Sequence, residues 1–221
     1  TATEVVVATD HDAIAAAVAA AGFACERTGE HATGTDRIGE VLGRREADLV
    51  VNLQGDEPLL DPAVVDRLVG DLQADPLADL ATCAHPFGPH DRWDDPSCVK
   101  VLVDRRGRAL YFSRAPVPGI FPGRAEGVAA ERLAWRHVGL YVWRAAALRR
   151  FLAWPRGDLE QCEGLEQLRA LENGLAIRVL PISEGPVGVD TPADLARVRA
   201  LWADRSRSGG DPTERSPEGN A

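Results

Sequence analysis

Residues 47–72 read ADLVVNLQGDEPLLDPAVVDRLVGDL, and this stretch decides the fold. The apolar residues 47–53 predict a buried strand, and the Asp-Pro pair that opens residues 61–72 predicts the cap and first turn of a helix. The acidic turn between them contains Gly55, which lets the backbone approach a ligand closely, and a proline that ends the strand. A strand, an acidic turn and a helix in this order are typical of an α/β sheet with functional groups at its strand ends.

A second acidic turn, GVDTP, occupies residues 188–192. Its proline fits the first position of a helix over residues 192–202, so Thr191 becomes the N-cap and Asp194 its partner in a capping box. This arrangement leaves Asp190 outside the helix and available for other interactions.

Asp56 and Asp190 each follow an apolar run, where α/β folds bring carboxylates together around a metal ion and a nucleotide phosphate. Mg²⁺ takes oxygen ligands and usually only one or two protein carboxylates, so two aspartates suffice. The alternative is that Asp56 and Glu57 are turn or cap residues and that Asp190 is a plain turn aspartate. The pattern favours an enzyme that handles phosphate groups with Mg²⁺.

The rest of the chain alternates strands and helices, which predicts a single α/β domain over residues 1–204 with a mostly parallel sheet. Residues 99–113 differ, because two short strands flank a glycine-containing connection typical of an antiparallel hairpin. Residues 115–126 are rich in proline and glycine and predict a loop, and the polar tail 205–221 is expected to be disordered. In chain order we expect strand 4–9, helix 12–21, strand 47–53, helix 61–72, strands 99–103 and 109–113, strand 138–143, helices 145–153 and 160–173, strand 176–182 and helix 192–202.

The composition excludes several classes of protein. The net charge is −9, which argues against a nucleic-acid partner, because such partners need a basic face. No apolar run approaches the roughly 20 residues that span a bilayer, so we expect no membrane insertion. The four cysteines lack metal-ligand spacing and indicate reduced thiols in the cytoplasm. Lys100 is the only lysine, and a surface position is expected for it.

Six motifs occur in the order TGTDR at 33–37, NLQGDEP at 52–58, YFSRA at 111–115, RHVGLY at 136–141, LEQLR at 165–169 and GVDTP at 188–192. Together they closely resemble the 3-deoxy-manno-octulosonate cytidylyltransferases, or CMP-Kdo synthetases. The resemblance runs from Val5 to about Trp202. It implies a Rossmann-like nucleotidyltransferase fold and transfer of a cytidylyl group from CTP to an eight-carbon acid sugar, with Mg²⁺ and release of pyrophosphate.

The resemblance also implies roles for individual residues. Asp56 and Asp190 would be the catalytic metal ligands. The expected nucleotide-binding residues are Arg37, Gln54 and Gly55. The expected sugar-binding residues are Arg114, His137, Tyr141, Glu166 and Gln167. Guanidinium, imidazole, phenol, amide and carboxylate groups suit a polyhydroxylated acid. Taken from the residues alone, the strand positions 137 and 141 and the helix positions 166 and 167 also fit purely structural roles.

The family begins with a strand and a loop that wraps the nucleotide phosphates, whereas this chain starts at the family's second strand. The resemblance therefore implies that the first strand is missing, and we expect little or no activity from this chain alone. It also implies a homodimer, with residues 109–126 as a candidate contact surface, and a place in lipopolysaccharide synthesis. Two alternatives stay open: a cytidylyltransferase for another, sialic-acid-like sugar, and a non-catalytic module that binds a sugar nucleotide.

Overall fold

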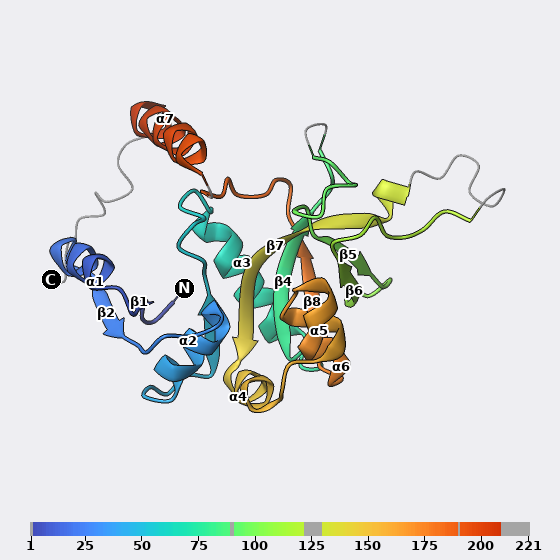
Figure 1. Ribbon diagram of the computed structural model, residues 1–221, viewed down its shortest axis with the longest axis horizontal. Coiled ribbons are helices and arrows are strands. Elements are labelled where there is room, and N and C mark those ends of the chain that lie inside the picture. The colour runs from blue at the N-terminus through green and yellow to red at the C-terminus, as the bar shows by residue number, and fades with distance from the viewer. Residues whose placement is uncertain (1, 89–90, 122–129, 190, 209–221) are drawn as a thin grey trace, which may run out of the picture. The chain divides into compact units, whose positions relative to one another are not determined.

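The computed structural model describes residues 2–88, 91–121, 130–189 and 191–208 (Figure 1). The chain divides into two compact units, one of Thr1–Gln54 with Pro62–Gly185 and one of Gly55–Asp61 with Pro186–Ala221. The strands are β1 (Val6–Thr9), β2 (Ala24–Arg27), β3 (Leu49–Asn52), β4 (Leu80–His85), β5 (Lys100–Val103), β6 (Ala109–Ser113), β7 (Ala134–Arg144) and β8 (Ile177–Pro181). The helices are α1 (Asp12–Ala20), α2 (Gly34–Leu42), α3 (Pro62–Ala74), η1 (Ala130–Arg132), α4 (Ala145–Ala153), α5 (Asp158–Glu163), α6 (Gln167–Glu172) and α7 (Pro192–Ser208).

The larger sheet has the order β6-β5-β7-β4-β8, and β3 also pairs with β7. Strand β7 runs antiparallel to β3, β4 and β5, while β4 and β8 are parallel. Figure 1 shows β7 as the long yellow strand that lies along β4. The α/β class is confirmed, but the sheet is mixed rather than mostly parallel, because one long strand takes three antiparallel neighbours. β1 and β2 form a separate parallel pair.

The expected hairpin is confirmed, since β5 and β6 pair antiparallel. Its turn contains Gly107 with φ of +77°, a conformation that favours glycine. The Gly107 carbonyl oxygen accepts a hydrogen bond from the N–H of Val179 at 2.8 Å. The turn is therefore held against β8, which fixes the hairpin on the sheet.

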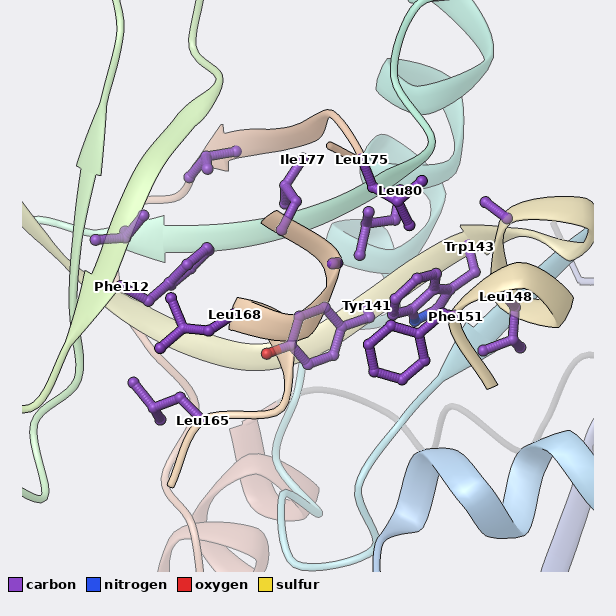
Figure 2. Packing of buried hydrophobic residues seen from close by; sticks show 14 of the residues in the cluster. Leu80, Phe112, Tyr141, Trp143, Leu148, Phe151, Leu165, Leu168, Leu175 and Ile177 are labelled. Atoms are coloured by element: carbon purple, nitrogen blue, oxygen red, sulfur yellow. The ribbon is translucent and has the colours of Figure 1, made fainter. Parts of the chain in front are cut away.

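The core packs helices α4 and α6 against β7 and its neighbours (Figure 2). The ring centroids of Trp143 and Phe151 lie 4.9 Å apart, and those of Tyr141 and Trp143 lie 6.4 Å apart. Leu168 of α6 is fully buried in the same cluster. Because each such side chain contributes about 1.5 to 3 kcal/mol on burial, this cluster holds β7 and α6 firmly in place.

The single helix expected over residues 160–173 is wrong, because the chain forms α5 and α6 with a break between them. Gly164 ends α5 with φ of 62°, in the left-handed region that glycine adopts without strain. As a result Glu166 is the N-cap of α6 rather than a residue on an exposed helix face.

Helix α7 ends at Ser208, so the predicted tail at 205–221 begins too early. The remaining tail residues, 209–221, lie outside the described residues, as does part of the predicted loop at 115–126. The single domain over residues 1–204 stays a prediction. Within the described part of the chain, no helix is long and apolar enough to cross a membrane.

Candidate functional site

A chain of polar side chains links the end of β3 to the start of α6. The Gln54 amide donates to Asn52 Oδ1 at 3.0 Å, and the Asn52 amide donates to Thr35 Oγ1 at 3.0 Å. The Thr35 hydroxyl in turn donates to Glu166 Oε1. Asn52 and Thr35 are each only 1% exposed. The structure thus brings together one residue expected to bind nucleotide, Gln54, and one expected to bind sugar, Glu166.

Gly34 gives the Gln54 amide its position. A Cβ at this glycine would lie 3.4 Å from both polar atoms of the amide, a tight contact. The absence of a side chain at Gly34 therefore lets the amide lie against the start of α2.

The Glu166 carboxylate is partly buried, and one of its two oxygens has no hydrogen-bond partner among the described residues. Burial raises the pKa of its carboxyl group, while the hydrogen bond from the Thr35 side chain acts in the opposite direction. The oxygen without a partner is Oε2, and this atom is buried. An unpaired buried oxygen is costly, so Glu166 is well suited to accept a hydrogen bond from a ligand hydroxyl.

The turn that presents Glu166 and Gln167 is fixed by a buried ion pair. Arg169 donates two hydrogen bonds to the Glu160 carboxylate, from Nε at 2.7 Å and from Nη2 at 2.6 Å. The Arg169 guanidinium also lies 4.3 Å from the centroid of the Phe151 ring. The pair joins α5 to α6 across the turn, and Gln167 beside it is 3% exposed.

Arg114 is held by backbone carbonyl oxygens. Its Nε–H donates to Glu163 O at 2.8 Å, and its terminal nitrogens donate to Pro96 O at 3.0 Å and Gly164 O at 3.4 Å. A guanidinium has five N–H donors, so two remain for other partners. Arg114 therefore joins the β6 end to the residues just before Glu166, and its expected role with the sugar stays a prediction.

The expectation of a surface position for Lys100 is wrong, because its side chain is fully buried. Its ammonium group donates to Asp95 O at 2.8 Å and Arg114 O at 2.7 Å. Desolvation lowers the pKa of Lys100. The only lysine of the chain thus links the backbone at Asp95 to the backbone at Arg114.

Glu163, at the end of α5, binds the two residues at the end of β6 and just after it. Its carboxylate accepts the Ser113 hydroxyl at 2.7 Å and the Arg114 backbone N–H at 2.8 Å. The end of β6 is therefore tied to α5 through both its backbone and its side chains.

His137 and Tyr141 lie close together on β7, with ring centroids 5.5 Å apart. The Phe112 ring meets the His137 ring edge-on at 4.9 Å. His137 Nε2 lies 2.9 Å from Thr82 Oγ1. Burial lowers the pKa of His137 to about 3, so the ring is neutral at physiological pH.

Arg37 is directed toward the end of β1. Its Nη1 atom donates to Thr28 Oγ1 at 2.6 Å and forms an ion pair with Asp10 at 3.1 Å. Its hydrogen bond is the main cause that lowers the pKa of Asp10. No hydrogen bond joins Arg37 to Gln54 in the described residues, so a shared nucleotide contact stays a prediction.

The second unit carries the acidic turns. The Val189 N–H donates to Asp56 O at 2.8 Å, so the residue before Asp190 lies against the first acidic turn. Asp56 is exposed. Burial, and then the charge of Asp56, raise the pKa of Glu57 to about 7. Glu57 Oε2 is buried without a hydrogen-bond partner among the described residues. This turn therefore carries acidic oxygen atoms that suit a cation.

The predicted capping box of α7 is confirmed. Asp194 Oδ2 accepts the Thr191 N–H at 2.9 Å, and Thr191 Oγ1 accepts the Asp194 N–H at 3.2 Å. Asp190 itself lies outside the described residues. Within those residues no group of three or more histidine, cysteine, aspartate or glutamate side chains could hold a metal ion, and the pairing of Asp56 with Asp190 stays a prediction.

Several polar residues with no role expected from the sequence lie beside the expected site in the structure. These residues are Thr35, Asn52, Thr82 and Glu163. Thr35 and Asn52 stand inside two of the six motifs, so their motif positions were an available signal. Thr82 and Glu163 stand outside the motifs and carry no local signal that we recognise.

Comparison with known proteins adds a further finding. The family model described as cytidylyltransferase matches residues 1–177. The 3-deoxy-manno-octulosonate cytidylyltransferase of Syntrophotalea carbinolica is 47% identical over 200 residues, which cover 89% of this chain and 80% of that protein. The enzyme of the same name from an Anaeromyxobacter species is 49% identical over 201 residues, 90% of this chain and 79% of that protein.

Similar solved structures include nucleotidyltransferases. A CMP:2-keto-3-deoxy-manno-octonic acid synthetase complexed with CTP superposes with a TM-score of 0.83 and 41% identity, covering 92% of this chain and 82% of that chain. A glucose-1-phosphate thymidylyltransferase from Bacillus anthracis superposes with a TM-score of 0.59 at 13% identity, over 90% of this chain and 75% of that one. The second similarity concerns the fold alone.

Proposed function

Because this chain belongs to the cytidylyltransferase family, we propose that it transfers a cytidylyl group from CTP to 3-deoxy-manno-octulosonate and releases pyrophosphate. The observation that carries the proposal is the polar chain from Gln54 through Asn52 and Thr35 to Glu166. It links the end expected to hold the nucleotide to the end expected to hold the sugar. We further infer a cytoplasmic enzyme whose product serves lipopolysaccharide synthesis.

The reaction needs alignment more than covalent help from the protein. A sugar hydroxyl oxygen attacks the α-phosphorus of CTP, the bond from that phosphorus to the pyrophosphate oxygen breaks, and the hydroxyl proton leaves. Such transfers are accelerated mainly by positioning and by stabilisation of charge. The hydroxyls of the sugar need hydrogen-bonding partners. The side chains that would supply them are those of Glu166, Gln167, His137 and Tyr141. Arg114 has two N–H donors left for the sugar carboxylate.

Asp56 and Asp190 would hold Mg²⁺. The fit rests on the Val189 N–H that donates to Asp56 O at 2.8 Å and on the buried Glu57 Oε2 in the same turn, which has no hydrogen-bond partner among the described residues. Oxygen donors of this kind are the ligands that Mg²⁺ prefers. When bound, the ion would neutralise charge on the phosphate oxygens.

An assay with CTP, 3-deoxy-manno-octulosonate and MgCl₂ tests the proposal, both on this chain and on one extended at its N-terminus. We expect pyrophosphate release together with a CMP-sugar of the correct mass, lost when EDTA is added and restored by excess Mg²⁺. Asp56→Asn should lower kcat at least about a hundredfold. Asp12→Asn, at an exposed aspartate, is the matched control and should leave kcat unchanged.

Two outcomes would redirect the assignment. Higher kcat/KM with a sialic-acid-like sugar, in a panel of 2-keto acid sugars, would favour the alternative substrate. Calorimetric binding of the sugar or of its CMP conjugate without any turnover would favour a non-catalytic binding module.

We also propose that the protein is a homodimer that uses residues near the hairpin. Four apolar side chains there are exposed: Leu110 61%, Ile120 56%, Phe121 72% and Leu133 53%. A contiguous patch of exposed apolar side chains is typical of an interface, and we propose that these four side chains belong to one. Light scattering should give a dimer mass, and Phe121→Ser should shift it toward the monomer. Leu77→Ser is the control, at an apolar residue that is 70% exposed in the α3–β4 turn, and it should leave the dimer mass unchanged.

A further inference from the structure

Thr82 is fully buried in β4 at an irregularity in its pairing with β7. Thr82 pairs with Tyr141, whereas the next residue of β4 pairs with Val138, so β7 has extra residues at this point. Bulges of this kind aim side chains in new directions and are frequent beside active sites.

The Thr82 hydroxyl has three polar neighbours at this bulge. Its Oγ1 atom lies 3.1 Å from Val138 O and 2.8 Å from Leu140 O, and it donates to these carbonyl oxygens. The third neighbour is His137 Nε2, at 2.9 Å. All three distances are within hydrogen-bond range.

The hydroxyl has one proton to share among these neighbours. Carbonyl oxygens only accept, so the single Thr82 proton must go to Val138 O or Leu140 O. If it went to His137 instead, both carbonyl oxygens would face the hydroxyl lone pairs, an unfavourable contact. The Thr82 oxygen is therefore an acceptor toward His137, and the ring nitrogen that faces it must carry a proton.

We propose that Thr82 is a positioning residue that holds His137 as the Nε2–H tautomer, so that Nδ1 is a lone-pair acceptor for a hydroxyl group of the acid sugar. A neutral imidazole has one N–H and one acceptor nitrogen, so assigning the proton to Nε2 assigns the lone pair to Nδ1. Within the described residues Nδ1 forms no hydrogen bond. The Phe112 and Tyr141 rings, with centroids 4.9 Å and 5.5 Å from that of His137, restrain the ring plane.

Two further facts agree with this assignment. The pKa of His137, about 3, keeps the ring neutral and so keeps one nitrogen unprotonated at neutral pH. An acceptor nitrogen selects for ligand groups that donate, such as sugar hydroxyls, over groups that only accept. The sugar as ligand rests on the proposed function, but the tautomer does not.

The tautomer can be measured directly in the unliganded protein. Long-range proton–nitrogen NMR of ¹⁵N-labelled protein at pH 7 separates the two tautomers by their ring nitrogen shifts, and the His137 signals are those missing from His137→Gln. We expect a protonated Nε2 and an unprotonated Nδ1. A protonated Nδ1, or a mixture of both forms, would overturn the proposal.

Kinetics test the consequence for binding. Thr82→Val keeps the shape and removes the hydroxyl, so KM for the sugar should rise about tenfold, as for loss of one well-placed hydrogen bond, while KM for CTP changes less than about twofold. Thr82→Ser keeps the hydroxyl and should restore both the KM and the wild-type nitrogen shifts.

Other results would count against a positioning role for Thr82. An unchanged sugar KM in a folded Thr82→Val variant, or an equal rise in both KM values, would show a structural role only. If Thr82→Val does not fold, as judged by circular dichroism, the wild-type NMR result decides. A wild-type protein that neither binds nor converts the sugar refutes the proposed function, and with it the ligand assigned to Nδ1, whereas the NMR result still decides whether Thr82 sets the tautomer.

Discussion

The Thr35 hydroxyl donates a hydrogen bond to the Glu166 carboxylate, although the two residues lie 131 positions apart in the chain. Thr35 stands in the first turn of α2 and Glu166 at the N-cap of α6. The same hydroxyl accepts a hydrogen bond from the Asn52 amide, so it acts as both donor and acceptor. This one side chain therefore couples the position of Glu166 to the end of β3.

Replacing Thr35 by valine should weaken the protein and both substrate sites. The change leaves Asn52 and Glu166 unpaired in a buried setting, so the free energy of unfolding should fall by about 1 to 3 kcal/mol. KM should rise several-fold for CTP and for the sugar, since Gln54 and Glu166 both lose support. Urea denaturation and steady-state kinetics measure these effects. Thr35→Ser is the control, and a Thr35→Val variant with wild-type values of both would contradict the coupling.

Lys100→Met should destabilise the protein although it removes a buried charge. The backbone carbonyl oxygens of Asp95 and Arg114 would lose their donor, which should cost about 1 to 3 kcal/mol of unfolding free energy. Arg105→Met removes the same charge from an exposed turn position and should change stability by less than about 0.5 kcal/mol. Equal stability of the two variants in urea would show that the buried ammonium group contributes nothing.

The Glu160–Arg169 pair should show strong coupling in a double-mutant cycle. Both side chains are nearly inaccessible, at 7% and 4% exposure, so Glu160→Met leaves an uncompensated buried charge and should cost about 3 to 5 kcal/mol. The double variant Glu160→Met/Arg169→Met should recover much of that loss, because no lone charge remains. Thermal and urea unfolding measure the cycle, and purely additive effects would argue against a tight pair.

Stability should fall as the pH drops below about 6.5, in part through His137. Its pKa is about 3 in the folded protein and near 6.5 when unfolded, so the unfolded chain binds the extra proton between these values. The free energy of unfolding therefore rises with pH across that window. In His137→Gln the difference between pH 7 and pH 4.5 should shrink by about 1 to 2 kcal/mol, allowing for partial exposure of the ring.

Urea unfolding at the two pH values measures this difference. An unchanged pH dependence in His137→Gln would mean that the ring already titrates normally in the folded state.

The sequence pattern predicts the structure correctly where that structure depends on near neighbours. The hairpin around Gly107 and the capping box of Thr191 with Asp194 were both predicted, because their hydrogen bonds join residues a few positions apart. It failed at Gly164, where helical periodicity continued on both sides of a glycine that turns the chain. It also missed β4, whose two alanines have little strand preference and whose residues are all buried, so that no alternation of apolar and polar residues marks the strand.

The sequence by itself determined the fold class, the resemblance to cytidylyltransferases and the residue types available at the site, because motifs and periodicity are properties of the chain. Tertiary structure alone decided that Lys100 is buried, that Arg114 is held by carbonyl oxygens, and that Thr82 faces His137. Those facts depend on contacts between residues distant in sequence. Packing of the paired strands and the helices brings such residues together, and no local pattern records which side chains meet.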